Sequence, residues 1–461
     1  MSDDRGFSVR GKRVTVAGAA RSGIAAAELL VRRGAQVVLS DLRAEIGDEA
    51  RLRSAGVTLE LGGHRIETFA NADAVVVSPG VPARQPAIEA ARQAGVPVMG
   101  ELELASRWLR GRIIAITGTK GKSTTTTLTG RMLEAGGRKV LVGGNIGHAL
   151  SAQVDQSTED TIHVVETSSF QLDTIETFHP WVAVLLNFSP DHLDRHASVA
   201  EYGAAKSRIF ANQTPEDWAV LNADDAASLG LAAGARSQRV FFSMRSDHPE
   251  GLAIEADAIV RRGPAGDERL VPLASVRLIG RHLLADVLAA CAIAGIAGVD
   301  SAAMTRAVEG FTGLEHALEP VGQIAGVLFV NDSKATNIEA ARRAIEAFDA
   351  GLVVIMGGRF KGGDFGDLAG PLVARGATIV VIGEARPLIH DAFSGRVNVL
   401  DADDMRAAVR KAFAAAPPGG AVLLAPACAS FDMFRDYAER GRIFKQEMLK
   451  LASEWNDTRE H

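Results

Sequence analysis

The chain has 461 residues, of which 47% are hydrophobic and 23% charged, and its formal net charge is −6. At roughly 100–200 residues per domain, this length predicts two to four domains. The mild acidity without a basic block argues against nucleic-acid binding. The polar start of the chain, the lack of about 18 consecutive apolar residues and the presence of only two cysteines predict a cytoplasmic protein without a membrane helix or a disulfide framework.

Short β-branched runs alternate along the chain with glycine-containing turns and Ala/Leu/Arg stretches at helical spacing, which predicts an α/β fold with mostly parallel sheets. The pattern starts afresh three times, so we expect three domains, at 1–100, 101–313 and 314–461. Shorter strand-like pieces at about 240–275 favour a β-rich insertion in the second domain. The predicted strands are Val14–Ala17, Val37–Ser40, Val75–Ser78, Ile113–Thr117, Thr161–Glu166, Val182–Asn187, Val327–Asn331, Leu352–Met356, Thr378–Ile382 and Ala421–Ala425.

The strongest motif, Gly118–Thr124 (GTKGKST), directly follows the strand predicted at Ile113–Thr117. Glycines let backbone N–H groups turn toward phosphates, and the following helix offers its positive N-terminus. Lys122 would reach the β- and γ-phosphates and Ser123 would bind Mg²⁺. The alternative is a glycine-rich turn with incidental lysines, because the first two glycines are closer together than in a strict P-loop. The strand–loop–helix context favours a nucleotide phosphate site.

A second glycine-containing loop, Gly18–Gly23, follows the first predicted strand and opens a helix. It resembles a dinucleotide fingerprint whose middle glycine is replaced by Ala20, and Asp41 ends the next strand, where an acid that binds a ribose would lie. The segment Ser78–Gly80 follows the third strand and faces the same crevice. A tight turn that needs glycine only for packing is a serious alternative.

A polar run, Asn187–His196, follows a predicted buried strand and places several oxygen and nitrogen donors on one loop. His192 could bind a metal through its neutral imidazole. Glu166, at the end of another strand of the same domain, supplies a candidate carboxylate for the same ion. The alternative is a solvated helix cap with Asp191 as the capping residue.

Three loops of the third region, Asn331–Asn337, Gly357–Gly363 and Pro426–Ser430, carry hydroxyl and lysine side chains. Each follows a predicted strand, and ligands of such sheets bind beyond the carboxyl ends of the strands. Together the loops would suit a dicarboxylate substrate; the alternative is three ordinary connections. Cys428 has apolar neighbours and is predicted to be a small packed residue, not a nucleophile.

These motifs resemble those of the Mur ligase family over essentially the whole chain. The resemblance implies a Rossmann-like UDP-binding domain, a central P-loop ATPase domain with a mostly parallel sheet, and a Rossmann-like C-terminal domain that binds glutamate. It implies an ATP-dependent ligase of peptidoglycan precursor synthesis that works through an acyl phosphate with two Mg²⁺ ions, acts on small molecules and is a monomer. The motifs for the family are Thr117–Thr124, Gly144–Gly147, Glu166–Leu172 and Asp191–Asp194, and those for the members that add glutamate to UDP-N-acetylmuramoyl-L-alanine are Asp332–Asn337, Lys361 and Pro426–Asp432.

The resemblance also implies roles for individual residues. Lys122, Lys206 and His192 would be catalytic, and Lys206 matches the lysine that the family carbamylates with CO₂, which turns a cation into a carboxylate-like metal ligand. The UDP-substrate ligands would be Arg21, Ser22, Asp41, Arg43, Ser78, Gly80 and Asn145. The ATP ligands would be Gly118, Thr119, Lys120, Gly121, Lys122, Ser123, Thr124, His316 and Asp332. The metal ligands would be Ser123, Glu166, His192 and carbamylated Lys206, and the glutamate ligands Lys334, Thr336, Lys361, Ser430 and Tyr437.

The chain departs from the family pattern around ATP. Lys120 stands where the family usually has asparagine, and Ala317 stands where an arginine usually follows the histidine. Leu283 and Asp286 occupy two positions that are usually asparagine, so adenine binding at these positions is not implied.

Several rival interpretations stay open. A folylpolyglutamate-type synthase or a Mur ligase for another amino acid differs in the C-terminal motifs. An NAD-dependent oxidoreductase that uses the first loop leaves the Lys122 loop without a purpose. A regulatory protein that has lost catalysis is suggested by Leu283, Asp286 and Ala317. Family precedent favours D-glutamate over L-glutamate, but no motif decides between them.

Overall fold

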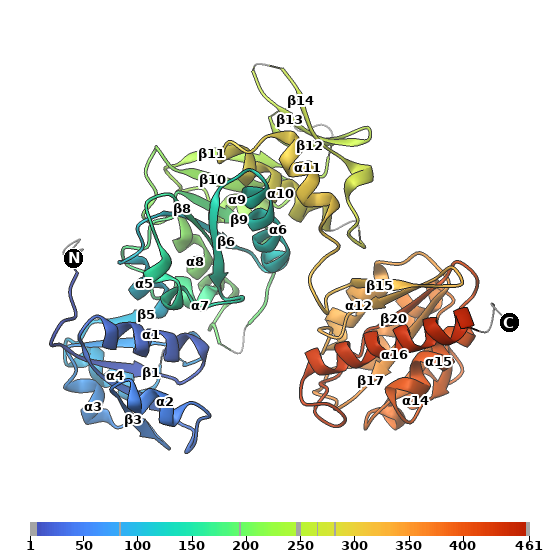
Figure 1. Cartoon of the computed structure of the whole chain (residues 1–461), viewed down its shortest axis with the longest axis horizontal. Helices are drawn as coiled ribbons and strands as arrows, with labels where there is room; N and C mark the ends of the chain where they lie inside the picture. Colours follow the sequence, from blue (N-terminus) through green and yellow to red (C-terminus); the bar gives the residue numbers. More distant parts are fainter. Residues whose placement is uncertain are drawn as a thin grey trace. The chain divides into compact units, whose positions relative to one another are not determined.

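The computed structural model describes residues 7–82, 84–192, 195–245, 250–264, 266–280 and 283–457. Within these ranges the chain forms three β-sheets with flanking helices (Figure 1). The first two sheets belong to one compact unit and the third belongs to a second compact unit. The predicted α/β class with mostly parallel sheets is therefore confirmed. Among the helices in the described ranges, none combines the length and the apolar character needed to cross a membrane.

The first sheet has five parallel strands in the order β3-β2-β1-β4-β5. Its central strand is buried along four of its five residues, as expected for a parallel strand covered on both faces. Strand β1 ends at Ala17 and helix α1 begins at Arg21, inside the Gly18–Gly23 segment. This segment therefore lies at the carboxyl end of the central strand. The elements are β1 (Arg13–Ala17), α1 (Arg21–Arg32), β2 (Gln36–Asp41), α2 (Glu49–Ser54), β3 (Val57–Leu61), α3 (Ile66–Ala70), β4 (Ala74–Val77), α4 (Pro86–Gln93) and β5 (Val98–Gly100).

The second sheet has nine strands in the order β14-β13-β12-β11-β10-β9-β6-β8-β7. It is parallel from β7 to β12 and antiparallel from β12 to β14. The strand-like pieces at 240–275 are thus real strands, and they extend the edge of this sheet. The strands and α-helices are α5 (Glu101–Ser106), β6 (Arg112–Thr117), α6 (Lys122–Ala135), β7 (Lys139–Gly144), β8 (Thr161–Glu166), α7 (Ser169–Leu172), β9 (Val182–Leu185), α8 (Val199–Ser207), β10 (Trp218–Asn222), α9 (Ala226–Leu231), β11 (Gln238–Phe242), β12 (Gly251–Glu255), β13 (Ala258–Arg262), β14 (Glu268–Pro272), α10 (Leu283–Ile296) and α11 (Ser301–Glu309). The short 3₁₀ helices of this part are η1 (Leu150–Ala152), η2 (Val154–Gln156), η3 (Arg208–Phe210) and η4 (Leu273–Ser275).

The third sheet has six strands in the order β15-β16-β20-β17-β18-β19, and only β15 is antiparallel to its neighbour. The elements are β15 (Glu319–Ile324), β16 (Val327–Asn331), α12 (Ile338–Glu346), β17 (Leu352–Gly357), η5 (Phe365–Leu368), α13 (Ala369–Ala374), β18 (Thr378–Ile382), α14 (Arg386–Phe393), β19 (Asn398–Asp401), α15 (Met405–Ala415), β20 (Ala421–Leu424) and α16 (Tyr437–Asp457).

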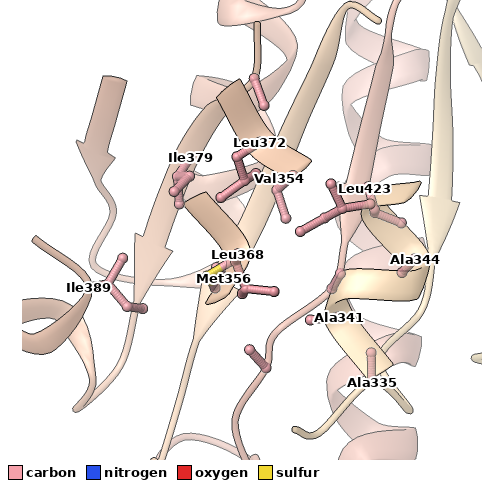
Figure 2. Close-up of a cluster of buried hydrophobic side chains, with 14 of the residues drawn as sticks. Ala335, Ala341, Ala344, Val354, Met356, Leu368, Leu372, Ile379, Ile389 and Leu423 are labelled. Carbon is pink, nitrogen blue, oxygen red and sulfur yellow. The ribbon is translucent and has the colours of Figure 1, made fainter. Parts of the chain in front are cut away.

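Successive residues of the third sheet point to opposite faces and build two cores. Val354 and Leu423 pack with helices α12, α13 and α14 on one face (Figure 2). Val353 and Val422 pack on the other face with residues of α15 and α16, which lie side by side (Figure 1). Because helices cover both faces of the sheet, the ends of the strands are left uncovered. The predicted site loops begin at the carboxyl ends of these strands.

Candidate functional site

The glycine loop between β6 and α6 has the strand–loop–helix geometry that the sequence predicts. Gly121 has φ 81°, and a Cβ at this position would lie 2.1 Å from Asp286 Oδ1, so both the conformation and the packing demand glycine. The Lys122 amine donates to the carbonyls of Gly118 and Thr119, at 3.0 Å each, and so curls over the loop. The start of helix α6 adds the positive end of a helix dipole, and the first N–H groups of a helix have no acceptor within it, which suits a phosphate group.

Asn187 holds the phosphate loop in place, a role that the sequence did not reveal. Its Oδ1 accepts hydrogen bonds from the backbone N–H groups of Thr119 (3.1 Å) and Lys120 (2.8 Å), and its Nδ2 donates to the Lys120 carbonyl. The only hint in the sequence is that Asn187 begins a polar run after a buried strand.

Asp191 caps none of the helices that the structure describes, which counts against the capping alternative for the polar run. Helix α8 is capped by Ser198, whose hydroxyl accepts a hydrogen bond from the Glu201 N–H at 3.1 Å. Asp191 instead lies 3.7 Å from the Lys120 amine, and both side chains are partly exposed. Leu193 and Asp194 of the same predicted motif lie outside the described residues.

Glu166 joins two loops of the central domain. Its Oε2 accepts a hydrogen bond from Ser123 Oγ at 2.6 Å and its Oε1 accepts one from Asn145 Nδ2 at 2.7 Å. Among the described residues, no three His, Cys, Asp or Glu side chains cluster as a metal site. Mg²⁺ prefers one or two carboxylates together with hydroxyl, water and phosphate oxygens. The Ser123 and Glu166 oxygens fit that preference.

His192 lies in an aromatic cluster beside the phosphate loop. Its ring is 5.3 Å from that of Phe170 and 6.1 Å from that of Tyr202, and its backbone has φ 54°. His196 stacks on Phe170 at 5.2 Å, and the Tyr202 hydroxyl lies 3.4 Å from Thr119 Oγ1. The cluster therefore anchors the His192 loop against the phosphate loop.

Lys206 is almost completely buried against the phosphate loop, although it comes from helix α8. Its amine donates to the Gly118 carbonyl at 2.7 Å, lies 3.5 Å from Thr117 Oγ1, and stands 4.7 Å from the centre of the Tyr202 ring. Burial, together with the positive charge of Lys122, lowers the pKa of Lys206 to about 7. A substantial fraction of this amine is therefore uncharged at neutral pH.

Asp41 organises the loop that follows β1. It accepts hydrogen bonds from the Ala19 N–H (2.6 Å) and from the backbone and side chain of Arg43 (2.9 Å each). Burial opposes the ionisation of Asp41, but these hydrogen bonds and the Arg43 charge outweigh burial and lower its pKa to about 2. Arg21 Nη1 donates to the Gly147 carbonyl at 2.8 Å, which links this loop to the central domain.

Packing explains both glycines of the first loop, and Gly18 also has φ 92°, a backbone conformation that favours glycine. A Cβ on Gly18 would lie 2.6 Å from Val81, and a Cβ on Gly23 would lie 1.8 Å from the Gly18 carbonyl oxygen. Ser22 lies in the first turn of α1, at the same strand end. The glycines therefore give no evidence for a dinucleotide.

A cavity of about 610 Å³ opens beside the loop that follows β4. Ser78 is buried at its edge, and the exposed Gly80 carbonyl accepts a hydrogen bond of 3.5 Å from Arg195. The cavity is lined by the loop after β4, by helix α7 and by the segment before α8, and its walls include Ser78, Phe170, Gln171, Thr174 and Arg195.

The three polar loops of the C-terminal unit follow β16, β20 and β17, which are neighbouring parallel strands. The structure brings Lys361 and Thr336 together through a hydrogen bond of 3.2 Å. Arg359 and Ala429 exchange backbone hydrogen bonds of 2.9 and 3.0 Å, which joins two of the loops. Ser430 lies buried in the third loop.

The other predicted residues of this unit differ in exposure. Lys334 is exposed and Tyr437 is 41% exposed. Cys428 is buried, and burial raises the pKa of its thiol to about 12, so its predicted packing role is confirmed.

His316 and Asp332 are both buried in the C-terminal unit. Asn331 Nδ2 lies 2.9 Å from His316 Nδ1, and burial lowers the pKa of this histidine. Asp332 accepts a hydrogen bond of 3.3 Å from the Leu318 N–H, and burial raises its pKa to about 7.

Comparisons with known proteins match this architecture along its whole length. Models of the Mur ligase MurD-like N-terminal domain, the Mur ligase middle domain and the Mur ligase glutamate ligase domain match residues 12–100, 116–294 and 318–428. The chain belongs to the Mur ligase family.

Two relatives of this Mur ligase are UDP-N-acetylmuramoylalanine–D-glutamate ligases. The protein from Acidobacterium capsulatum is 45% identical over 98% of this chain and 99% of its own length. The protein from Koribacter versatilis is 44% identical over 97% of this chain and 99% of its own length. Solved structures with the same fold include the UDP-N-acetylmuramate-alanine ligase of Thermotoga maritima, with a TM-score of 0.60, 19% identity, and coverage of 95% of this chain and 99% of that one.

The departures of this Mur ligase from its family pattern have structural counterparts. The extra charge of Lys120 is balanced by Asp191. Asp286 packs against Gly121, and burial raises its pKa well above the ordinary value. Leu283 begins helix α10, and Arg281 and His282, of the same motif, lie outside the described residues. Nothing in the structure explains Ala317.

Proposed function

We propose that this Mur ligase joins D-glutamate to UDP-N-acetylmuramoyl-L-alanine with ATP, in the synthesis of the peptidoglycan precursor. The supporting observation is the Lys122 loop and the Ser123–Glu166 pair at neighbouring strand ends, in a chain 45% identical over 98% of its length to a ligase of that name. ATP and UDP-sugars are cytoplasmic metabolites, so we place the protein in the cytoplasm. We propose the domain limits 1–100, 101–313 and 314–461.

The proposed reaction has two steps. An oxygen of the alanyl carboxylate attacks the γ-phosphorus of ATP, the bond to ADP breaks, and an acyl phosphate forms. The glutamate amine then attacks the acyl carbon, an amide forms, and inorganic phosphate and a proton leave. The first step brings two anions together, so their repulsion is the main obstacle.

Lys122 is the residue that reduces this repulsion. Its amine donates hydrogen bonds of 3.0 Å to two carbonyls of the phosphate loop, and it can donate to phosphoryl oxygens in their place. Ser123 and Glu166 would hold Mg²⁺, which when bound neutralises phosphoryl charge. Alignment of the reactants adds to this effect, since good positioning lowers such barriers by roughly 7–11 kcal/mol.

Lys206 supports the same centre as a carbamate. The lone pair of its uncharged amine would attack CO₂, one proton would leave, and the product would be an anionic carbamate. The position of this amine, buried 2.7 Å from the Gly118 carbonyl, supports the proposal because a carboxylate-like group there would face the phosphate loop. A carbamate would join Ser123, Glu166 and His192 as metal ligands.

The substrate loops follow from the same proposal. Arg21, Ser22, Asp41, Arg43, Ser78, Gly80 and Asn145 would bind the UDP-sugar. Lys334, Thr336, Lys361, Ser430 and Tyr437 would bind glutamate, and the contact between Lys361 and Thr336 supports this grouping. His316 and Asp332 would be the residues of the C-terminal unit that bind the nucleotide.

The experiment that tests the function measures phosphate release with UDP-N-acetylmuramoyl-L-alanine, ATP and Mg²⁺, with D-glutamate, L-glutamate or no amino acid. We expect release that depends on D-glutamate, and a product whose mass equals that of the UDP-sugar plus one glutamyl residue. Equal release with and without glutamate, or a product with L-glutamate only, would refute the proposal.

A further inference from the structure

Arg440 lies in the first turns of helix α16 and is completely buried in the C-terminal unit. Its Nε donates to Ser333 Oγ at 3.0 Å, its Nη2 donates to the Ser333 carbonyl at 2.9 Å, and its Nη1 donates to the Cys428 carbonyl at 3.1 Å. All of these partners are neutral oxygens. No sequence motif singles out this residue, and the mechanism above does not use it.

A buried guanidinium without an acidic partner is unusual, because desolvation of the charge is costly. Within the described residues, no acidic side chain is hydrogen-bonded to the Arg440 guanidinium, and Asp432 acts on it through electrostatic attraction. Burial lowers the pKa of Arg440 to about 10, so it keeps its positive charge at neutral pH. The C-terminal unit therefore holds a fixed cation behind its strand ends.

Arg440 donates hydrogen bonds to two of the three loops to which we assign the glutamate ligands, and its guanidinium lies close to the third. Ser333 precedes Lys334 in the loop after β16, and Cys428 lies two residues before Ser430 in the loop after β20. A Cβ on Gly358, in the loop after β17, would lie 3.3 Å from Arg440 Nη1. A planar guanidinium can reach acceptors in several directions at once, whereas a lysine ammonium is a point charge on a flexible stem.

Ser333 also joins the loop after β16 to the start of helix α16. Ser333 Oγ accepts the Arg440 Nε–H and also donates to the Tyr437 carbonyl at 2.7 Å, at the start of the same helix. The loop after β16 is thus fixed to α16 at two points, and any shift of the helix would move the loop.

We propose that Arg440 is a positioning residue for the amino-acid substrate: it holds the three strand-end loops together and supplies a fixed positive charge that favours a dicarboxylate over an analogue whose side chain is uncharged. This inference rests on the proposed function and deepens it, because it names the residue that makes the enzyme prefer a substrate with a negatively charged side chain. The charge acts through the loops, since the guanidinium is not exposed.

The experiment compares the wild-type chain with Arg440→Met, Arg440→Lys and the control Arg442→Met. Arg442 is exposed on the same helix, and its Nε donates to the nearby Ala438 carbonyl. KM is measured separately for glutamate, ATP and the UDP-sugar, and kcat/KM is measured for glutamate and glutamine. We expect Arg440→Met to raise KM for glutamate about tenfold or more, and to change the other two KM values less than about twofold.

The preference for glutamate over glutamine separates the role of the charge from a merely structural role. It should fall in Arg440→Met and persist in Arg440→Lys, which keeps the charge, while Arg442→Met should match the wild type. The inference is overturned if KM for glutamate is unchanged in Arg440→Met, if all three KM values rise alike, or if the preference survives in Arg440→Met.

A second variant covers the possibility that Arg440→Met does not fold. Ser333→Ala removes the acceptor of the Nε–H and should raise KM for glutamate selectively, by a smaller factor. Unchanged KM values in both Ser333→Ala and Arg440→Lys would then overturn the inference. A wild-type chain that releases no phosphate with glutamate would refute the proposed function itself, whereas an active wild type with unaffected variants would refute only the role of Arg440.

Discussion

Ser123 and Glu166 are joined by a hydrogen bond of 2.6 Å that links the start of helix α6 to the end of strand β8. The pairing of β6 with β8 makes this contact possible, because it sets Ile116 opposite Glu166 and leaves the phosphate loop directly above the carboxylate. Two residues 43 positions apart in sequence thus form one oxygen-rich site.

Replacing Glu166 by Gln tests this site. The change keeps the size of the side chain but removes the negative charge that would attract Mg²⁺, so kcat should fall about 100-fold or more and the Mg²⁺ concentration for half-maximal activity should rise. Steady-state rates over a Mg²⁺ series measure both effects. Glu159→Gln, an exposed position just before β8, should leave them unchanged. A Glu166→Gln variant with the Mg²⁺ dependence of the wild type would rule out the assigned role.

Replacing Lys122 by Ala removes the cation that we assign to the phosphoryl group. Phosphate release should fall about 1,000-fold or more, since the transferred phosphoryl group loses the cation that we place beside it. Lys120→Ala is the matched control, and its effect should be far smaller because Lys120 is exposed and pairs with Asp191. Near-normal turnover of Lys122→Ala would exclude it from the chemistry.

Replacing Gly121 by Ala should destabilise the fold for two separate reasons. Alanine at φ 81° costs about 1 kcal/mol, and its Cβ would lie 2.1 Å from Asp286 Oδ1, which adds about 1–3 kcal/mol of overpacking. Gly137→Ala, at φ 74° with no atom within 4 Å, should cost only the first amount. Urea unfolding measures both variants, and adding Asp286→Ala should recover part of the larger loss. Equal losses for the two alanine variants would show that Asp286 does not restrict the loop.

Replacing Lys206 by Ala should abolish activity, and a short carboxylic acid added to the assay should restore part of it. The truncated side chain leaves space where the carbamate would stand, and a free carboxylate can fill it. Chloride at the same ionic strength is the control and should restore nothing. Full activity of Lys206→Ala without any additive would remove this lysine from the site.

His163 should make the fold sensitive to acid. It is fully buried on β8, its Nε2 lies 2.7 Å from Ser157 Oγ, and burial lowers its pKa from 6.5 to about 4. The depressed pKa means that its contribution is complete above pH 6.5 and is lost as the pH falls toward 4, up to about 3 kcal/mol. Unfolding free energies between pH 7 and 4 should fall less steeply in His163→Gln than in the wild type. Parallel curves would contradict this assignment.

Local sequence patterns were enough to predict the strands whose ends carry the candidate site, but not the whole of each sheet. Short β-branched runs predicted ten strands that the structure contains, although β9 ends at Leu185, two residues before the predicted end. The sequence patterns missed other strands, namely β3, β5, β7, β10, β15 and β19. Because carboxyl ends of parallel strands share one edge, the grouping of Glu166 with the Lys122 loop could also be predicted.

Contacts that depend on tertiary packing could not be predicted in this way. Lys206 lies on a helix, and only its resemblance to a family motif pointed to the site. The binding of the phosphate loop by Asn187 depends on side-chain geometry across 67 residues. The local sequence around Arg440 predicts only an arginine on a helix. Its burial depends on the folded unit and could not be predicted from neighbouring residues.

Transfer of oxygen is the most direct test of the acyl-phosphate reaction. UDP-N-acetylmuramoyl-L-alanine labelled with ¹⁸O in the alanyl carboxylate is incubated with ATP, Mg²⁺ and D-glutamate, and the released phosphate is analysed by mass spectrometry. If the carboxylate attacks the γ-phosphorus, each phosphate carries one ¹⁸O atom from the substrate. Unlabelled phosphate, released while the amide product forms, would contradict the proposed chemistry.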